Sequence, residues 1–259
     1  MTRRHLTFEC EGARLVATLD TAPGRTALLL VSGGNEVRSG AWNGQARLAA
    51  GVAAQGYPVL RFDRRGVGDS EGINEGFRSA APDIAAARQA LLSQCPQVDR
   101  VIGMGNCDAA SALMLAAGAG MDGLVLSNPW TIERESDEAP VQVVRDHYRR
   151  RLSDPAAIRR LLTGKVSLPA LLRSLAHVLR KDPKADGDSL ADLMKRGISG
   201  YQGTVRFLVA GKDRTGRAFL SRWDRADPRL HICPDASHSY VEPEAKEWLL
   251  RQVLEALRQ

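Results

Sequence analysis

The hydrophobic pattern of the chain alternates between short apolar runs and longer amphipathic segments. The apolar runs have the length of buried strands and lie at residues 26–31, 58–62, 101–105, 123–127, 204–210 and 230–233. Segments with helical periodicity lie at 43–54, 82–93, 108–119, 217–223 and 242–257. Strands that alternate with helices in this way are typical of a doubly wound, mostly parallel α/β sheet, and we predict that fold class.

The alternation has two exceptions, one near the start of the chain and one in its middle. Two short alternating runs at 6–8 and 15–19 flank Gly12, which predicts an antiparallel hairpin at a sheet edge. Between 130 and 200 the pattern is helical only, with segments near 141–152, 155–162, 168–179 and 189–195. We therefore predict a core in two parts, 1–129 and 201–259, interrupted by a helical cap or lid at 130–200.

The composition is that of an ordinary globular protein, with 44% hydrophobic and 25% charged residues. No apolar run is long enough for a membrane span or a signal peptide, so we expect a cytoplasmic location and no membrane insertion. The four cysteines form no C-x-x-C pair, which argues against a disulfide framework or a zinc site. We expect neither a metal nor an organic cofactor, and the oligomeric state leaves no mark on the sequence.

The net charge of +6 is concentrated in one segment, because residues 145–181 hold ten Lys and Arg against two acids. This segment is either a set of solvated helix faces or a surface that attracts an anionic substrate. Tyr148 is the only aromatic residue among the basic ones, and the lack of stacking platforms argues against nucleic acid as a partner.

The stretch with the strongest chemical signal runs from the apolar segment 101–105 directly into a helical one. Gly105-Asn106-Cys107-Asp108-Ala109 has the form of a nucleophile elbow, in which small residues allow a strand and a helix to approach closely. Two other interpretations compete with it. Gly103-x-Gly105 could open a dinucleotide fingerprint, although that motif needs a small residue where Asp108 stands. Alternatively, Cys107 is a packed core cysteine.

Further polar residues and glycines follow the other predicted strands. In an open α/β sheet, functional residues lie at the carboxyl ends of the strands. The residues at these ends are Gly33, Gly34, Asp63, Cys107, Asn128, Asp213 and His238. A nucleophile, an acid and a base thus occur in the order Cys107, Asp213, His238. Asp235 is a rival acid, but it lies only three residues from His238.

With these motifs the chain resembles the α/β-hydrolase superfamily over nearly its whole length. The turn Asp63-Arg64-Arg65-Gly66-Val67-Gly68-Asp69-Ser70 is similar to the D-x-R-G-x-G-x-S turn of that superfamily, and the triad has its chain order. More narrowly, residues 32–36 (Ser-Gly-Gly-Asn-Glu) and the elbow at 105–109 resemble the hydrolase 1 group associated with exosortase A systems. That resemblance implies a link to exopolysaccharide and envelope-protein sorting.

The resemblance assigns roles to the matched positions. Cys107 would be the nucleophile, His238 its base and Asp213 the acid that orients the imidazole. The N–H groups of Gly34 and Asp108 would form the oxyanion hole. We further expect Gly33, Asn35, Asn106 and Trp130 to contact the substrate. The sequence departs from the family pattern in Ser32, where most members carry His, and in Ala109, where they carry Gly.

The implied activity is hydrolysis of an ester or thioester through an acyl-cysteine intermediate. A thiolate attacks activated acyl groups well, and a cysteine beside an imidazole at a helix N-terminus favours that form. The substrate would be a small-molecule or carrier-linked acyl compound. An acyltransferase that passes the acyl group to a sugar or other hydroxyl is an alternative, and a non-catalytic scaffold is another.

Overall fold

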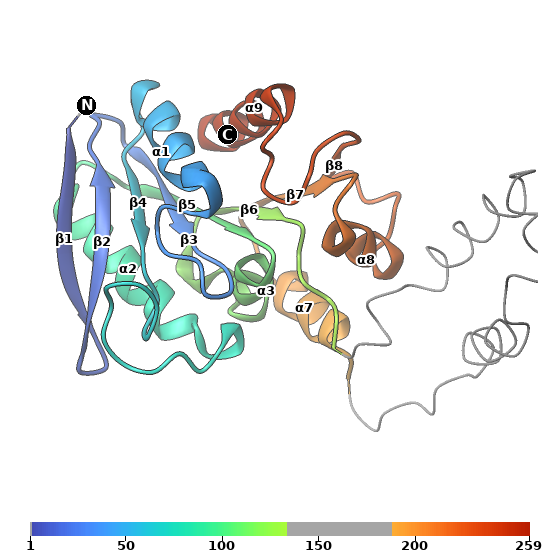
Figure 1. Cartoon of the computed structure of the whole chain (residues 1–259), viewed down its shortest axis with the longest axis horizontal. Helices are drawn as coiled ribbons and strands as arrows, with labels where there is room; N and C mark the ends of the chain where they lie inside the picture. Colours follow the sequence, from blue (N-terminus) through green and yellow to red (C-terminus); the bar gives the residue numbers. More distant parts are fainter. Residues whose placement is uncertain (1, 134–187) are drawn as a thin grey trace, which may run out of the picture. The chain divides into compact units, whose positions relative to one another are not determined.

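The computed structural model describes residues 2–133 and 188–259, and these contain a sheet of eight strands (Figure 1). The spatial order of the strands is β1-β2-β4-β3-β5-β6-β7-β8. β2 runs antiparallel to its neighbours β1 and β4, and all remaining pairs are parallel. The strands are β1 (Arg3–Cys10), β2 (Ala13–Asp20), β3 (Thr26–Val31), β4 (Val59–Phe62), β5 (Arg100–Asn106), β6 (Gly123–Ser127), β7 (Thr204–Ala210) and β8 (Leu230–Cys233).

Helices cover both faces of this sheet. On one face, α1 (Gly44–Ala54) and α9 (Pro243–Arg258) pack on each other and on the central strands. The other face carries α2 (Ala81–Gln94), α3 (Asp108–Leu115), α7 (Leu190–Ser199) and α8 (Arg214–Arg222). Figure 1 shows these two layers above and below the strands. The predicted doubly wound α/β class is therefore confirmed.

The central strands are continuous apolar runs because each buries side chains on both faces. In β3, Leu28 and Leu30 belong to the core under α1 and α9, whereas Leu29 and Val31 belong to the core under the opposite helices. This period of two is the pleat of a strand. The N-terminal hairpin is also present: Cys10 pairs with Ala13 across the turn that contains Gly12.

Most predicted elements are confirmed with small changes at their ends. The helix expected at 108–119 ends at Leu115, and a short 3-10 helix, η3 (Ala117–Gly120), follows it. Ala117, directly after the C-cap of α3, has φ 47° and Gly118 has φ 80°, so the backbone leaves the α-helical conformation there. Two further 3-10 helices, η1 (Ala41–Asn43) and η2 (Phe77–Ser79), precede α1 and α2.

The compact unit that contains the sheet consists of residues 1–131 and 190–259. The boundary therefore falls at Leu190, because α7 packs on α3, whereas we predicted that the core resumes at 201. The rest of the predicted cap, with its helices at 141–152, 155–162 and 168–179 and its basic segment 145–181, lies outside the described residues. No helix in the described ranges is both long and apolar enough to cross a membrane.

The packing of α7 on α3 predicts an unusual response to alanine. A Cβ on Gly197 would overlap the carbonyl oxygen of Met114 in α3, whereas a Cβ on Gly200 meets nothing within 4 Å. At Gly197, inside α7, alanine favours the helix by about 1 kcal/mol, but overpacking costs about 1–3 kcal/mol. Gly200 follows α7 directly and has no positive φ, so alanine there only reduces the conformational entropy of the unfolded chain. We expect Gly197→Ala to lower the free energy of unfolding in urea and Gly200→Ala to leave it unchanged or raise it. Equal stability of the two variants would contradict this packing.

Candidate active site

The turn between β5 and α3 places Cys107 in a strained backbone conformation. Cys107 has φ 61° and ψ −127°, a region that costs a residue with a side chain about 1–3 kcal/mol. Its N–H donates to the carbonyl of Ser127 at 2.9 Å, and its own carbonyl accepts from the N–H of Trp130 at 3.2 Å. A Cβ on Gly105 would lie 2.6 Å from the backbone of Ala109, so only glycine fits there. Tertiary hydrogen bonds thus hold the cysteine at the carboxyl edge of the sheet.

The loops after β7 and β8 bring an acid and an imidazole to this edge. His238 Nδ1 lies 2.9 Å from Asp213 Oδ2. Asp213 is also the N-cap of α8 and accepts a hydrogen bond from the N–H of Gly216 at 2.9 Å. Asp235, the rival acid, is about 90% exposed and pairs with Lys212. The structure therefore joins Asp213, and not Asp235, to His238.

The ion pair shifts the pKa values of both partners. Burial alone would raise the pKa of Asp213, but hydrogen bonds from His238 and from the backbone of Gly216 and Thr215 hold it below its ordinary value. The Asp213 carboxylate and a hydrogen bond with Cys107 raise the pKa of His238 from 6.5 to about 10, although burial opposes this. The folded chain thus retains a proton on His238 that the unfolded chain releases. The resulting stabilisation is complete below pH 6.5 and is lost as the pH rises towards 10.

A chain of amide hydrogen bonds reaches the other ring nitrogen of His238. The N–H of Ala210 donates to Asn128 Oδ1 at 2.8 Å, so Asn128 presents its Nδ2 to Asn106 Oδ1 at 3.0 Å. This leaves Asn106 Nδ2 facing His238 Nε2 at 3.3 Å. An amide N–H there favours an unprotonated Nε2, whereas Asp213 favours the imidazolium. Asp213 and Cys107 thus favour a protonated His238, and the Asn106 amide opposes them.

The loop after β3 lies against the nucleophile turn. A Cβ on Gly33 would overlap the Asp108 carboxylate and lie 2.8 Å from the Asn106 carbonyl oxygen. Gly34, at φ 53°, donates its N–H to Asp108 Oδ1 at 2.7 Å, and its carbonyl accepts from Arg64 Nη2 at 2.5 Å. The predicted oxyanion donor Gly34 is therefore engaged by a carboxylate in this structure. The N–H of Asp108 lies in the first turn of α3, where such groups have no carbonyl partner within the helix.

Arg64 balances the charge of Asp108. Its guanidinium is buried, with 4% of the side chain exposed, and lies 4.0 Å from Asp108 Oδ2. From the sequence, Arg64 is only a member of the 63–70 turn and has no predicted role. Its position directly after the strand-end residue Asp63 is the signal that points to it.

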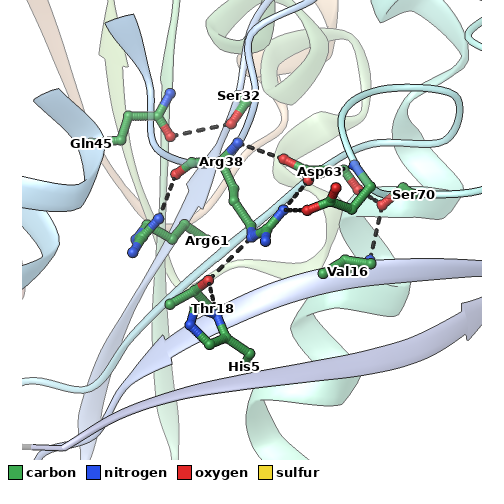
Figure 2. Close-up of polar contacts among 10 residues, drawn as sticks. His5, Val16, Thr18, Ser32, Arg38, Gln45, Arg61, Asp63 and Ser70 are labelled. Carbon is green, nitrogen blue, oxygen red and sulfur yellow. Dashed lines mark hydrogen bonds and ion pairs between the residues drawn. The ribbon is translucent and has the colours of Figure 1, made fainter. Parts of the chain in front are cut away.

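A second polar network, shown in Figure 2, holds the loop after β3 through Arg38. Arg38 pairs with the fully buried Asp63 through both its backbone N–H, at 2.5 Å, and its guanidinium. The guanidinium also reaches Thr18 Oγ1 at 3.2 Å, and Arg61 donates to the Arg38 carbonyl at 2.9 Å. These contacts hold the segment that carries Gly33 and Gly34 against the ends of β2 and β4.

The remaining predicted substrate contacts are placed differently. Asn106 lies at the centre of the polar cluster. Asn35 is exposed and accepts a hydrogen bond from Asn74 Nδ2 at 2.8 Å. Trp130 is half-buried against the core, and its carbonyl accepts from Ser111 at 2.8 Å. In the described ranges, no group of three or more His, Cys, Asp or Glu side chains could hold a metal ion.

The polar residues gathered at the carboxyl ends of the parallel strands lie where active sites occur in open α/β sheets. The sequence profile described as the Alpha/beta hydrolase family matches residues 28–252. The chain therefore belongs to the α/β hydrolase family. A search of curated protein sequences finds no significant match.

Solved structures share the fold at low sequence identity. The chain is similar to the Pyrococcus furiosus esterase Pf2001, with 15% identity, a TM-score of 0.63, and coverage of 99% of this chain and 90% of the other. It is also similar to XC6422 from Xanthomonas campestris, described as an α/β serine hydrolase without lid. The identity is 15%, the TM-score is 0.59, and the match covers 99% of this chain and 94% of the other. A third similar structure is Est1E from Butyrivibrio proteoclasticus, solved with ferulic acid. The identity is 15%, the TM-score is 0.58, and the match covers 98% of this chain and 100% of the other. The narrower exosortase-associated group stays a prediction.

The amide chain predicts a shift in the titration of His238. Asn106→Asp keeps an acceptor for Asn128 but replaces the N–H that faces Nε2 with a carboxylate oxygen. We expect the pKa of His238 to rise above its wild-type value, measured by NMR titration of the ring protons with His238→Gln as the assignment. Asn35→Asp adds the same charge and keeps the acceptor for Asn74, and so serves as the control. Equal shifts in the two variants would contradict the assignment.

Proposed function

We propose that the protein is an acyl hydrolase that cleaves an ester or a thioester through Cys107, His238 and Asp213. The observation that carries the proposal is the hydrogen-bonded pair of His238 and Asp213, 2.9 Å apart, beside a cysteine on a strained strand-to-helix turn. A nucleophile, a base and a group that orients the base are the minimum set for covalent acyl transfer.

The proposed reaction has two halves. The thiol proton resides on His238 Nε2, in keeping with the raised pKa of that imidazole, so Cys107 Sγ attacks the acyl carbon as a thiolate while Asp213 stabilises the imidazolium. The tetrahedral intermediate expels the leaving group, which takes the proton from His238, and an acyl-cysteine remains. Water then attacks this thioester with His238 as the base, which releases the acid and restores the thiol. A thiolate is a good leaving group, so the mechanism suits thioesters and reactive esters better than amides.

The oxyanion hole of this proposal uses the N–H groups of Asp108 and Gly34. Since the Asp108 carboxylate accepts from Gly34 in the resting structure, the oxyanion has to displace it. Arg64, 4.0 Å from that carboxylate and hydrogen-bonded to the Gly34 carbonyl, is placed to hold the loop and to receive the displaced charge.

The biological context of the proposal rests on the sequence. The resemblance of residues 32–36 and 105–109 to the exosortase A-associated group supports a role in exopolysaccharide or envelope-protein systems. All four cysteines, Cys10, Cys95, Cys107 and Cys233, are free thiols, which suits a reducing compartment such as the cytoplasm. The basic segment 145–181 supports an anionic or carrier-linked substrate.

Substitutions of the three residues test the mechanism. We expect Cys107→Ala to lower kcat/KM for an acetyl thioester by at least about 10³-fold, because no nucleophile remains. Asp213→Asn should lower it by about 10²–10⁴-fold through loss of the imidazolium partner. Asp235→Asn, in the same loop as His238 but exposed, should leave the rate unchanged. After the wild-type reaction is quenched with acid, mass spectrometry should detect the acyl group on Cys107. Wild-type rates in Cys107→Ala would refute the mechanism.

Asp108 provides a separate test of the oxyanion hole. Asp108→Asn keeps an acceptor for Gly34 but removes the negative charge and leaves the Arg64 cation in excess. We expect kcat to rise roughly tenfold, the size of one partly screened charge interaction. Asp69→Asn, an exposed carboxylate that pairs with Arg38 at the same sheet edge, is the control. A fall in kcat would show that the Asp108 carboxylate assists the reaction instead of opposing the oxyanion.

A further inference from the structure

A cavity of about 570 Å³ lies between α1 and α9, on the α1/α9 face of the sheet. Asn106 and Ser239, which are the chain neighbours of Cys107 and His238, line one part of it. Asn106 follows Ile102 and Met104 on the same face of β5, so the cavity runs from the reactive corner along that face. Its volume is that of a small-molecule site.

The walls of the cavity are mainly aliphatic. Leu30 and Met104 contribute from the strands, Leu48 from α1, and Leu249 and Leu250 from α9. Of the charged residues that border it, Arg47, Lys246 and Glu247 are exposed, whereas Glu36 is half-buried. Hydrocarbon side chains therefore make up most of the wall.

Exposed apolar side chains border the same cavity. Trp42 is 78% exposed and Val241 is 40% exposed, and both line it. Trp42 and Asn43 each adopt φ 56°, a left-handed conformation that is costly for residues with side chains. Strained backbone that displays a large apolar side chain beside an apolar cavity is typical of a ligand site.

We propose that this cavity binds the unbranched aliphatic acyl chain of the substrate while its carbonyl carbon reacts at Cys107. The inference rests on the proposed function and names its substrate class. A carrier or alcohol leaving group is polar and has to depart into water after it takes a proton, whereas the acyl group remains on Cys107 through the second half of the reaction. The apolar, walled space beside Asn106 therefore suits the acyl half of the substrate.

The contact between α1 and α9 beyond Leu250 limits the length of the chain. A Cβ on Gly51 of α1 would lie 3.5 Å from the two terminal carbons of Leu250 in α9, so the helices meet there. Gly44, the first residue of α1, also lines the cavity, and a Cβ at this position would have no protein atom within 4 Å. A side chain at Gly44 can therefore enter the cavity without displacing protein atoms.

A series of acyl thioesters from acetyl to decanoyl tests the proposal. We expect kcat/KM of the wild type to rise about fourfold per added methylene until the cavity is filled. Gly44→Phe should lower the ratio of decanoyl to acetyl kcat/KM at least about tenfold, the equivalent of two buried methylenes. Gly200→Phe is the matched control, because Gly200 also has open space and lies on the surface. An identical ratio in wild type and Gly44→Phe would overturn the inference and leave the proposed function intact.

Binding of decanoate, measured by calorimetry on Cys107→Ala, separates the two proposals. We expect saturable binding that Gly44→Phe weakens at least about tenfold in the same background and that Gly200→Phe does not change. Absence of binding would overturn the inference. Binding that depends on Gly44, in a protein whose wild type hydrolyses no thioester of any length, would overturn the proposed function and keep the cavity as an aliphatic binding site.

Discussion

The close approach of β5 to α3 is the constraint on which the rest of the site depends. Strand and helix backbones can come this near only because Gly105 and Ala109 are small, and the turn between them forces Cys107 into a positive φ. Hydrogen bonds from neighbouring segments, at Ser127 and Trp130, offset that strain. The thiol is thereby presented at the edge of the sheet where the loops after β3, β7 and β8 also end.

The imidazole beside this thiol is controlled from two sides. Asp213 favours its charged form, and the Asn106 amide favours its neutral form. The orientation of that amide is fixed through Asn128, whose own orientation is fixed by the backbone N–H of Ala210. Because both controls are hydrogen bonds within the folded core, the protonation of His238 depends on the packing of β6 and β7 as much as on its own loop. A base held between two such influences can accept and release a proton in the same cycle.

Asp108 distinguishes this site from a simple oxyanion hole. The carboxylate directly after Cys107 accepts the Gly34 N–H that we propose as an oxyanion donor, and the buried Arg64 compensates its charge. Without substrate, the Gly34 N–H is thus occupied by the Asp108 side chain. The cavity between α1 and α9, which Asn106 also lines, is mainly apolar.

The sequence alone predicts much of this arrangement. Continuous apolar runs predicted the parallel strands, since a strand buried on both faces has no polar side. The glycine–cysteine corner and the polar residues at strand ends predicted Cys107, Asp213 and His238, because parallel strands place their carboxyl ends at one edge. These inferences are local, so a single sequence is enough to make them.

Tertiary structure alone decided the rest. The contact of Asp108 with Gly34, the charge balance by Arg64 and the amide chain from Ala210 to His238 join segments that are distant in sequence. The same holds for α7, which the helical pattern assigned to the cap but which packs on α3 within the sheet unit. The cavity between α1 and α9 is likewise not predictable from the sequence, because it depends on how far apart the two helices pack as well as on the side chains that line it. Sequence pattern determines which face of an element is apolar, whereas only the packed fold determines what that face meets.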